Sequence, residues 1–202
     1  MSEPRDPAIA GREAQVAALS NDALIVDLLQ MINNLSRWLT PIHDRTRLEA
    51  TERRAHTSVK EVLLELRDHE VAVYSLMYAI ATQINPDLDR IPLQERSLLQ
   101  RSADERANAL VILAEFRRVR DSSTALLRAL PDNAWERGGY SRTNRDWTIR
   151  QLAESLAVND WAQLGRLDRA LDESGARRSI AHVSRVSRDE IRQPRLGAVE
   201  AR

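Results

Sequence analysis

The segment SVKEVLLEL, which runs from Ser58 to Leu66, decides the fold class of this chain. Ser58 and Glu61 form a capping box, in which the serine oxygen and the glutamate carboxylate each accept a hydrogen bond from a free backbone N–H at the start of a helix. Apolar residues then recur at gaps of three and four positions, which places them on one face of a helix. These residues are Val62, Leu63, Leu66, Val73, Tyr74, Met77, Ala81 and Ile84. The sequence therefore predicts an amphipathic helix that begins at Ser58 and ends before Pro86.

Three further segments carry the same kind of apolar stripe. The first of them in the chain ends at Pro41, because the proline ring blocks continuation of a helix. Another opens at a second capping box, Ser102–Glu105, and runs to Leu130. The last opens at a third box, Thr148–Gln151, and closes at Gly175. The chain is thus expected to hold four long amphipathic helices.

Four such helices in one chain favour an all-α fold, a four-helix bundle in which each apolar stripe is buried against the others. Residues 85–101 form a long crossover between the second and third helices. The expected organisation is a flexible N-terminal segment over 1–19, the bundle over 20–171, and an arginine-rich C-terminal tail over 172–202. We expect the tail to be partly disordered or to form one weak extra element.

Composition excludes several classes of function. The chain has 202 residues, with 30 basic against 30 acidic side chains, and this balance argues against nucleic-acid or membrane-surface binding. It has no cysteine, which excludes disulfides, cysteine-ligated zinc and a thiolate nucleophile. None of its four histidines lies three or four positions from another, so no helical histidine pair can chelate a metal. No targeting or membrane-spanning stretch is visible, so we expect a cytoplasmic, bacterial protein.

Polar residues interrupt two of the stripes. At about 100° per residue, Asn159 and Gln163 of the fourth helix point into its apolar face, with Asp160 beside them. On the second helix, Glu65 and His69 are four positions apart, where they can pair or hold one metal. An unpaired buried amide costs about 1–3 kcal/mol, so these groups need partners or a wet cavity.

Two interpretations of these polar residues remain open. In the first, the amides form hydrogen bonds that fix helix register, and Glu65 and His69 form a solvated ion pair. In the second, Glu65, His69, Asn159 and Gln163 line a polar binding pocket inside the bundle, where four-helix bundles place their cofactor and metal sites.

Two other features are less specific. The basic cluster Phe116–Arg120 is interpreted as a solvated face rather than a phosphate site. Trp161 falls opposite the apolar stripe of its helix, which suits either a subunit interface or packing under a loop of the same chain.

Short motifs in all four helices resemble those of DinB-like (DinB/YfiT-like) proteins. Ser58–Leu66 resembles the family segment W-S-V-K-E-V-L-x-H-L. The stretch Phe116–Trp135 is similar to its third helix and L-x-x-L-P-x-x-x-W turn. Trp147–Leu152 and Asn159–Leu164 resemble its closing W-T-V-R-x-L and H-D-x-x-H-L motifs. The resemblance covers residues 20–171.

This resemblance implies a four-helix bundle with a long connection between its second and third helices, and a homodimer. It also implies a divalent metal held by three histidines, which some members use to activate a small thiol in mycothiol- or bacillithiol-dependent transfer and isomerisation. Those metal positions fall on Glu65, Asn159 and Gln163 here, and none is histidine. Amide oxygens are poor ligands for zinc or nickel, which prefer imidazole.

We therefore expect a bundle of unassigned activity, without the family's metal site or another cofactor, whose central polar pocket binds a small molecule or only specifies packing. The alternative is a metal-dependent thiol S-transferase or isomerase with altered ligands. In that case Glu65 and His69 hold the divalent metal, and Asn159 and Gln163 orient water or substrate. A third possibility is a partner-binding bundle that acts through Trp161.

Overall fold

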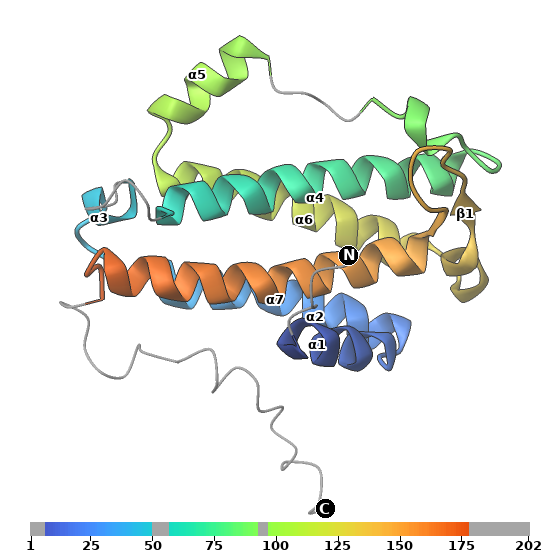
Figure 1. The fold of residues 1–202 in the computed structure, drawn as a ribbon, viewed down its shortest axis with the longest axis horizontal. Coiled ribbons are helices and arrows are strands. Elements are labelled where there is room, and N and C mark those ends of the chain that lie inside the picture. The colour runs from blue at the N-terminus through green and yellow to red at the C-terminus, as the bar shows by residue number, and fades with distance from the viewer. Residues whose placement is uncertain (1–6, 50–56, 93–96, 178–202) are drawn as a thin grey trace, which may run out of the picture.

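The computed structural model describes residues 7–49, 57–92 and 97–177, and its centre is a bundle of long helices (Figure 1). Helix α4 packs against α6 and α7, and α2 packs against the same two helices. The predicted all-α four-helix bundle is therefore confirmed, with the long connection between its second and third helices, α4 and α6. The bounds of these helices are α2 Asn21–Leu39, α4 Val59–Thr82, α6 Ala109–Ala129 and α7 Ile149–Glu173.

Local sequence sets the ends of α4 and α7 as predicted. The Ser58 hydroxyl accepts from the backbone N–H of Glu61 at 3.1 Å, and the Glu61 carboxylate accepts from that of Ser58 at 2.6 Å. Thr148 and Gln151 form the same reciprocal box at the start of α7. After α7, Gly175 adopts a φ of 64°, a left-handed conformation that glycine reaches at little cost.

The hydrophobic core is divided into two clusters along the bundle. One cluster includes Phe116 and Leu164, and the other includes Leu28 and Val73. On α4, α6 and α7 the sequence between the two clusters carries a buried charged residue. These residues are Glu70, Arg120 and Asp160. A charged layer thus separates two apolar halves.

The structure differs from the flexible segment expected over 1–19. Pro7–Ala17 form helix α1, which packs against α7. Val16 is fully buried in the second cluster, and Arg12 forms an ion pair with Asp27 of α2. The burial of Val16 and the ion pair between Arg12 and Asp27 therefore hold α1 in place. The apolar stripe of this segment is too weak to predict a helix from the sequence.

The third bundle helix begins later than predicted. Ser102 lies inside a separate short helix, α5 (Leu98–Arg106), which opens with a capping box of Ser97 and Gln100. The chain then breaks at Ala107, and Asn108 caps α6 by accepting from two backbone N–H groups. Gln can replace Glu at the third position of a capping box, so the box at Ser97, five residues before the predicted one at Ser102, fixes the start of α5. A 3-10 turn, η1 (Leu88–Arg90), lies earlier in the same crossover.

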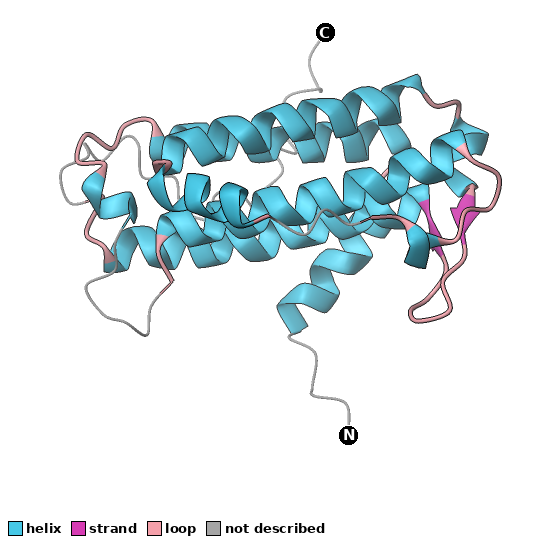
Figure 2. Ribbon diagram, turned by 90° about the horizontal axis from the view of Figure 1, so that it is seen from above, coloured by secondary structure: helices cyan, strands magenta, loops and turns pink. Residues whose placement is uncertain are grey.

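The segment from 131 to 147 folds back on one end of the bundle, and Trp135 anchors it there. Trp135 is buried within the 3-10 helix η2 (Asp132–Glu136). Two short antiparallel strands, β1 (Gly138–Gly139) and β2 (Trp147–Thr148), follow (Figure 2). A Cβ at Gly139 would lie 2.6 Å from a methyl carbon of Leu88, so only glycine fits.

At the opposite end, the one-turn helix α3 (Thr46–Glu49) packs against α4. The Arg47 guanidinium donates to the carbonyl of Ser174 at 3.0 Å, just after α7. The expected C-terminal tail begins there, and its first residues pack on the bundle: Ala176 is buried and Arg177 lies 4.8 Å from the centre of the Trp38 ring. Residues 178–202 of the tail lie outside the described residues. Of the helices described, none has the length and apolarity to cross a membrane.

Candidate functional site between α4, α6 and α7

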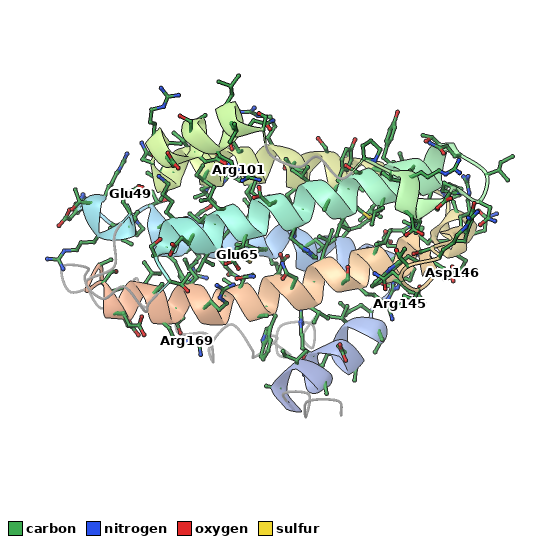
Figure 3. All side chains as sticks on the ribbon, turned by 45° about the horizontal axis from the view of Figure 1, so that its top comes forward. Glu49, Glu65, Arg101, Arg145, Asp146 and Arg169 are labelled. Carbon is green, nitrogen blue, oxygen red and sulfur yellow. The ribbon has the colours of Figure 1, made fainter. Side chains whose placement is uncertain are left out.

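Glu65 points from α4 toward α7, where its carboxylate meets a guanidinium (Figure 3). Arg166 donates from Nη2 to Oε1 of Glu65 at 3.0 Å and from Nη1 to Oε2. The same Nη1 donates to Oε1 of Gln163 at 3.1 Å, and the Gln163 amide lies 3.4 Å from the Glu65 carboxylate. The two side chains of the ion pair are partly open to solvent, 48% for Glu65 and 32% for Arg166.

The structure thus brings together two of the four predicted residues, Glu65 and Gln163, and adds Arg166. Arg166 lies three positions after Gln163 on the same face of α7, which is the signal that could have identified it. Its hydrogen bond is the main cause that holds the pKa of the Glu65 carboxyl below its usual range. Glu65 is therefore a carboxylate at neutral pH, and it is already paired with the guanidinium of Arg166.

His69 and Asn159 take no part in the contacts that join Glu65, Gln163 and Arg166. Within the described part of the chain, no hydrogen bond joins His69 to Glu65, so the expected pair across one helical turn is not formed. The Nε2 atom of His69 is buried and has no hydrogen-bond partner among the described residues. Burial lowers the pKa of His69, and the nearby Arg120 acts in the same direction while Glu70 opposes it. The imidazole is consequently neutral at pH 7. Asn159 is half-buried on α7.

The charged layer at the centre of the bundle joins all four long helices. Arg120 of α6 donates to both oxygens of Asp160, at 2.6 and 2.9 Å, and to Glu70 at 2.7 Å. It also donates to the carbonyl of Leu28 on α2 at 3.0 Å. All three charged side chains are buried. One guanidinium therefore balances two carboxylates in a region of low dielectric constant.

Burial governs the protonation of this layer. It raises the pKa of Asp160 to about 6, because desolvation of the carboxylate outweighs the attraction of Arg120, and the negative charges of Glu70 and Asp27 act in the same direction. Burial opposes the charged form of Arg120, but the two carboxylates overcome this effect and its pKa stays raised. The second oxygen of Glu70, Oε1, has no hydrogen-bond partner among the described residues. The layer is thus polar, rigid and short of one positive charge when both acids ionise.

Sequence reasoning assigned Arg120 to a solvated basic face, and this prediction is wrong. Within the cluster, Phe116 and Arg120 are buried, Arg117 bonds to the hydroxyl of Ser36, and only Arg118 is exposed. The spacing of Arg120, four positions after a core phenylalanine, was the signal for its burial. Its partner Asp160 was correctly placed in the apolar face of α7.

The donors at the three positions that the resemblance assigns to a metal do not fit a zinc- or nickel-type ion. Among the described residues, no group of three or more His, Asp or Glu side chains could hold a metal ion. Two of the three positions are amides, Asn159 and Gln163, and the third, Glu65, is paired with Arg166. A metal at this position would have to displace the guanidinium of Arg166 from that carboxylate.

Trp161 lies on α7 and is half-buried. Helix α1 packs against α7 and so covers part of its outer side with the chain's own N-terminal region.

Comparison with known proteins identifies the fold. No protein-family model matches the sequence, and no curated protein does. Among solved structures, the chain is similar to YfiT from Bacillus subtilis, described as a probable metal-dependent hydrolase with an unusual four-helix bundle topology. The TM-score is 0.58 at 20% identity, and the match covers 86% of this chain and 92% of YfiT. The resemblance to DinB/YfiT-like bundles is therefore confirmed at the level of the fold.

Proposed function

We propose that this chain is a DinB-like bundle that binds a small polar molecule, without a metal, at the face where α4 meets α7. The observation that carries the proposal is the guanidinium of Arg166, which binds both Glu65 and Gln163. These are two of the three positions that the family resemblance assigns to metal ligands. A positive charge from the chain itself takes the place of the charge that a metal would supply.

The same arrangement suggests how a ligand would be held. Arg166 and Glu65 are partly exposed, so a ligand can reach them from solvent, whereas Gln163 is buried behind them. An exposed ion pair is worth at most about 1 kcal/mol, and a ligand can exchange for either partner at small cost. Carboxylates and phosphates suit the planar fork of Arg166.

Metal content provides the first test. The purified wild-type protein should contain no stoichiometric metal, and Zn²⁺, Ni²⁺ or Mn²⁺ should leave its melting temperature unchanged. As a positive control, the variant Glu65→His/Asn159→His/Gln163→His/Arg166→Gln rebuilds three imidazoles and should be stabilised by Ni²⁺ or Zn²⁺. Near-stoichiometric metal in the wild type that is lost on Gln163→Ala would refute the proposal.

Ligand binding is tested with a screen of small polar molecules followed by ligand-observed NMR. Molecules found in the screen should no longer bind to Arg166→Gln. They should still bind to Arg169→Gln, which removes an exposed arginine from the same helix. Hits that are insensitive to Arg166→Gln would contradict the assignment of the site. A screen that finds no binding molecule would also contradict the assignment of the site.

A second candidate is a metal-dependent enzyme, either a hydrolase as described for YfiT or a thiol S-transferase or isomerase. The observation in its favour is the neutral imidazole of His69, whose buried Nε2 is without a hydrogen-bond partner among the described residues. A neutral imidazole is a metal ligand and a general base. Stabilisation by Mn²⁺, Ni²⁺ or Zn²⁺ that is lost in His69→Ala would favour this candidate over the first.

We also propose that the chain forms a homodimer through the outer face of α7 that includes Trp161. Aromatic side chains are enriched at subunit interfaces, and Trp161 is only half-buried in the isolated chain. Light scattering coupled to gel filtration should give a dimer for the wild type and a monomer for Trp161→Ala. A monomeric wild type, or a dimer that survives the substitution, would refute this interface.

A further inference from the structure

A groove of about 770 Å³ lies between the outer face of α4 and the short helix α5, away from the α4–α7 site. Its apolar lining comes from α4 and consists of Leu64, Val71 and Ala72. This volume lies within the range of about 300–1,000 Å³ that is typical of sites for small molecules. The groove is therefore large enough for an organic ligand and has a surface on which an apolar group can pack.

Helix α5 forms one wall of the groove without packing into the core. Figure 1 shows α5 standing apart from α4 at one end of the bundle, and none of its residues is buried. Leu98 and Leu99 are more than 80% exposed. A bidentate ion pair holds the helix: Asp104 accepts from the buried Arg67 of α4 at 2.8 and 3.0 Å. Lys60 of α4 also donates to the backbone carbonyl of Glu105 in α5 at 2.9 Å. Polar contacts, rather than packing of apolar side chains, thus hold α5 beside α4.

The rim of the groove is acidic. Five carboxylates line it, and they are Glu49, Glu61, Asp68, Asp104 and Glu105. Two cationic side chains, Lys60 and Arg101, line it as well. Lys60 lies 3.4 Å from the carboxylate of Glu49, which neutralises its charge locally. Even when the buried Arg67 is added to these two, the carboxylates outnumber the cations among the described lining residues, so this part of the rim carries net negative charge.

We propose that this groove binds an organic cation that has an apolar body, such as an alkylammonium. The apolar body would lie on Leu64, Val71 and Ala72, and the ammonium would lie at the rim near Asp68. The Asp68 carboxylate accepts from the buried Arg67 at 3.0 Å through one oxygen, and its side chain is 46% exposed. Charge complementarity selects a cation, because a carboxylate or phosphate would meet the same rim with like charge. The site shares no lining residue with the face formed by Glu65, Gln163 and Arg166.

Three probes with the same alkyl chain and different charge test this proposal in the full-length protein. Hexylammonium, hexan-1-ol and hexanoate are titrated while the amide and methyl signals of α4 and α5 are followed by NMR. The expected order of affinity is hexylammonium, then hexanol, then hexanoate, with shifts centred on Leu64, Val71 and Ala72. Equal affinity for all three probes would overturn the proposal. The same holds if hexylammonium gives no saturable shifts or gives shifts centred elsewhere.

Substitutions separate the roles of charge and of the apolar floor. Asp68→Asn should weaken hexylammonium at least threefold and leave hexanol unchanged, a loss on the order of that for one exposed charge pair. Asp121→Asn is the matched control, because it removes one exposed carboxylate that does not line the groove. Val71→Lys places a cation on the floor and should abolish binding of hexylammonium. Equal weakening by Asp68→Asn and Asp121→Asn would show a general charge effect and refute a specific site.

Discussion

Arg120 on α6 donates hydrogen bonds to both carboxylate oxygens of Asp160 on α7, at 2.6 and 2.9 Å, in the middle of the bundle. A third bond, to Glu70 on α4, completes a charged layer between two hydrophobic clusters. A slip of any of these helices by one turn would bring a buried charge against apolar side chains. The layer therefore fixes the register of the bundle at a cost in desolvation that an all-apolar core would avoid.

Removing the cation of this layer should be strongly destabilising. In Arg120→Met, Asp160 and Glu70 lose their partner while they remain buried. We expect the free energy of unfolding to fall by about 3–5 kcal/mol, as measured by urea denaturation at pH 7. The control Arg118→Met removes an exposed arginine two positions earlier and should change stability by no more than about 0.5 kcal/mol. A loss below about 1 kcal/mol for Arg120→Met would show that the layer is not buried as described.

The raised pKa of Asp160 predicts a specific pH dependence. Because burial raises its pKa from 3.8 to about 6 on folding, the folded protein binds a proton more tightly than the unfolded chain. The stabilisation from that proton is complete below the unfolded pKa and is lost as pH rises through about 6. The free energy of unfolding of the wild type minus that of Asp160→Asn should therefore decrease as the pH rises from about 4 to about 6. A difference that is constant or rises over this interval contradicts the prediction.

Asp89 should hold the loop that follows β1. Its carboxylate accepts from the hydroxyls of Ser141 and Thr143 and from the backbone N–H of Arg142, and these bonds lower its pKa to about 2. The contribution of Asp89 is present above its unfolded pKa of 3.8 and is lost as pH falls through about 2. In Asp89→Ala, amide hydrogen exchange should accelerate at Arg142 and Thr143. Exchange at Gln151 in α7 serves as the internal control and should not change.

The ion pair between Asp104 and Arg67 should control whether α5 stays in place. Asp104→Ala removes the bidentate contact, while Arg67 keeps Asp68 and Glu115 as partners. Hydrogen exchange of residues 98–106 should therefore accelerate about tenfold, the effect of a loss of about 1.4 kcal/mol, without acceleration in α4. Glu105→Ala is the control, because Lys60 bonds to its backbone carbonyl rather than to its carboxylate. Equal acceleration in the two variants would show that the ion pair does not hold α5.

The candidate site was predictable in part. Gln163 and Asp160 were placed in the apolar face of α7 by helical periodicity, and both are buried there. Glu65 was identified at the flank of α4, but its partner Arg166 was not. The spacing of Arg166 from Gln163 places both on one face of α7 but does not show which residue of α4 that face meets. For His69, spacing left open a pair with Glu65 or a place in a binding pocket, and in the structure its buried Nε2 has no hydrogen-bond partner among the described residues. Partner choice across helices depends on rotamers that spacing does not determine.

By itself, the sequence determined the local structure of this protein. The serine, threonine and asparagine caps, the apolar stripes and the proline and glycine stops fixed the four long helices, because each of these signals acts within about one helical turn. Only the tertiary structure decided which charges meet in the core, that α1 docks on α7, and that the crossover contains the separate helix α5. These features depend on burial and on contacts between residues far apart in the chain, such as Arg120 with Asp160. Their free energies appear only when the helices pack together.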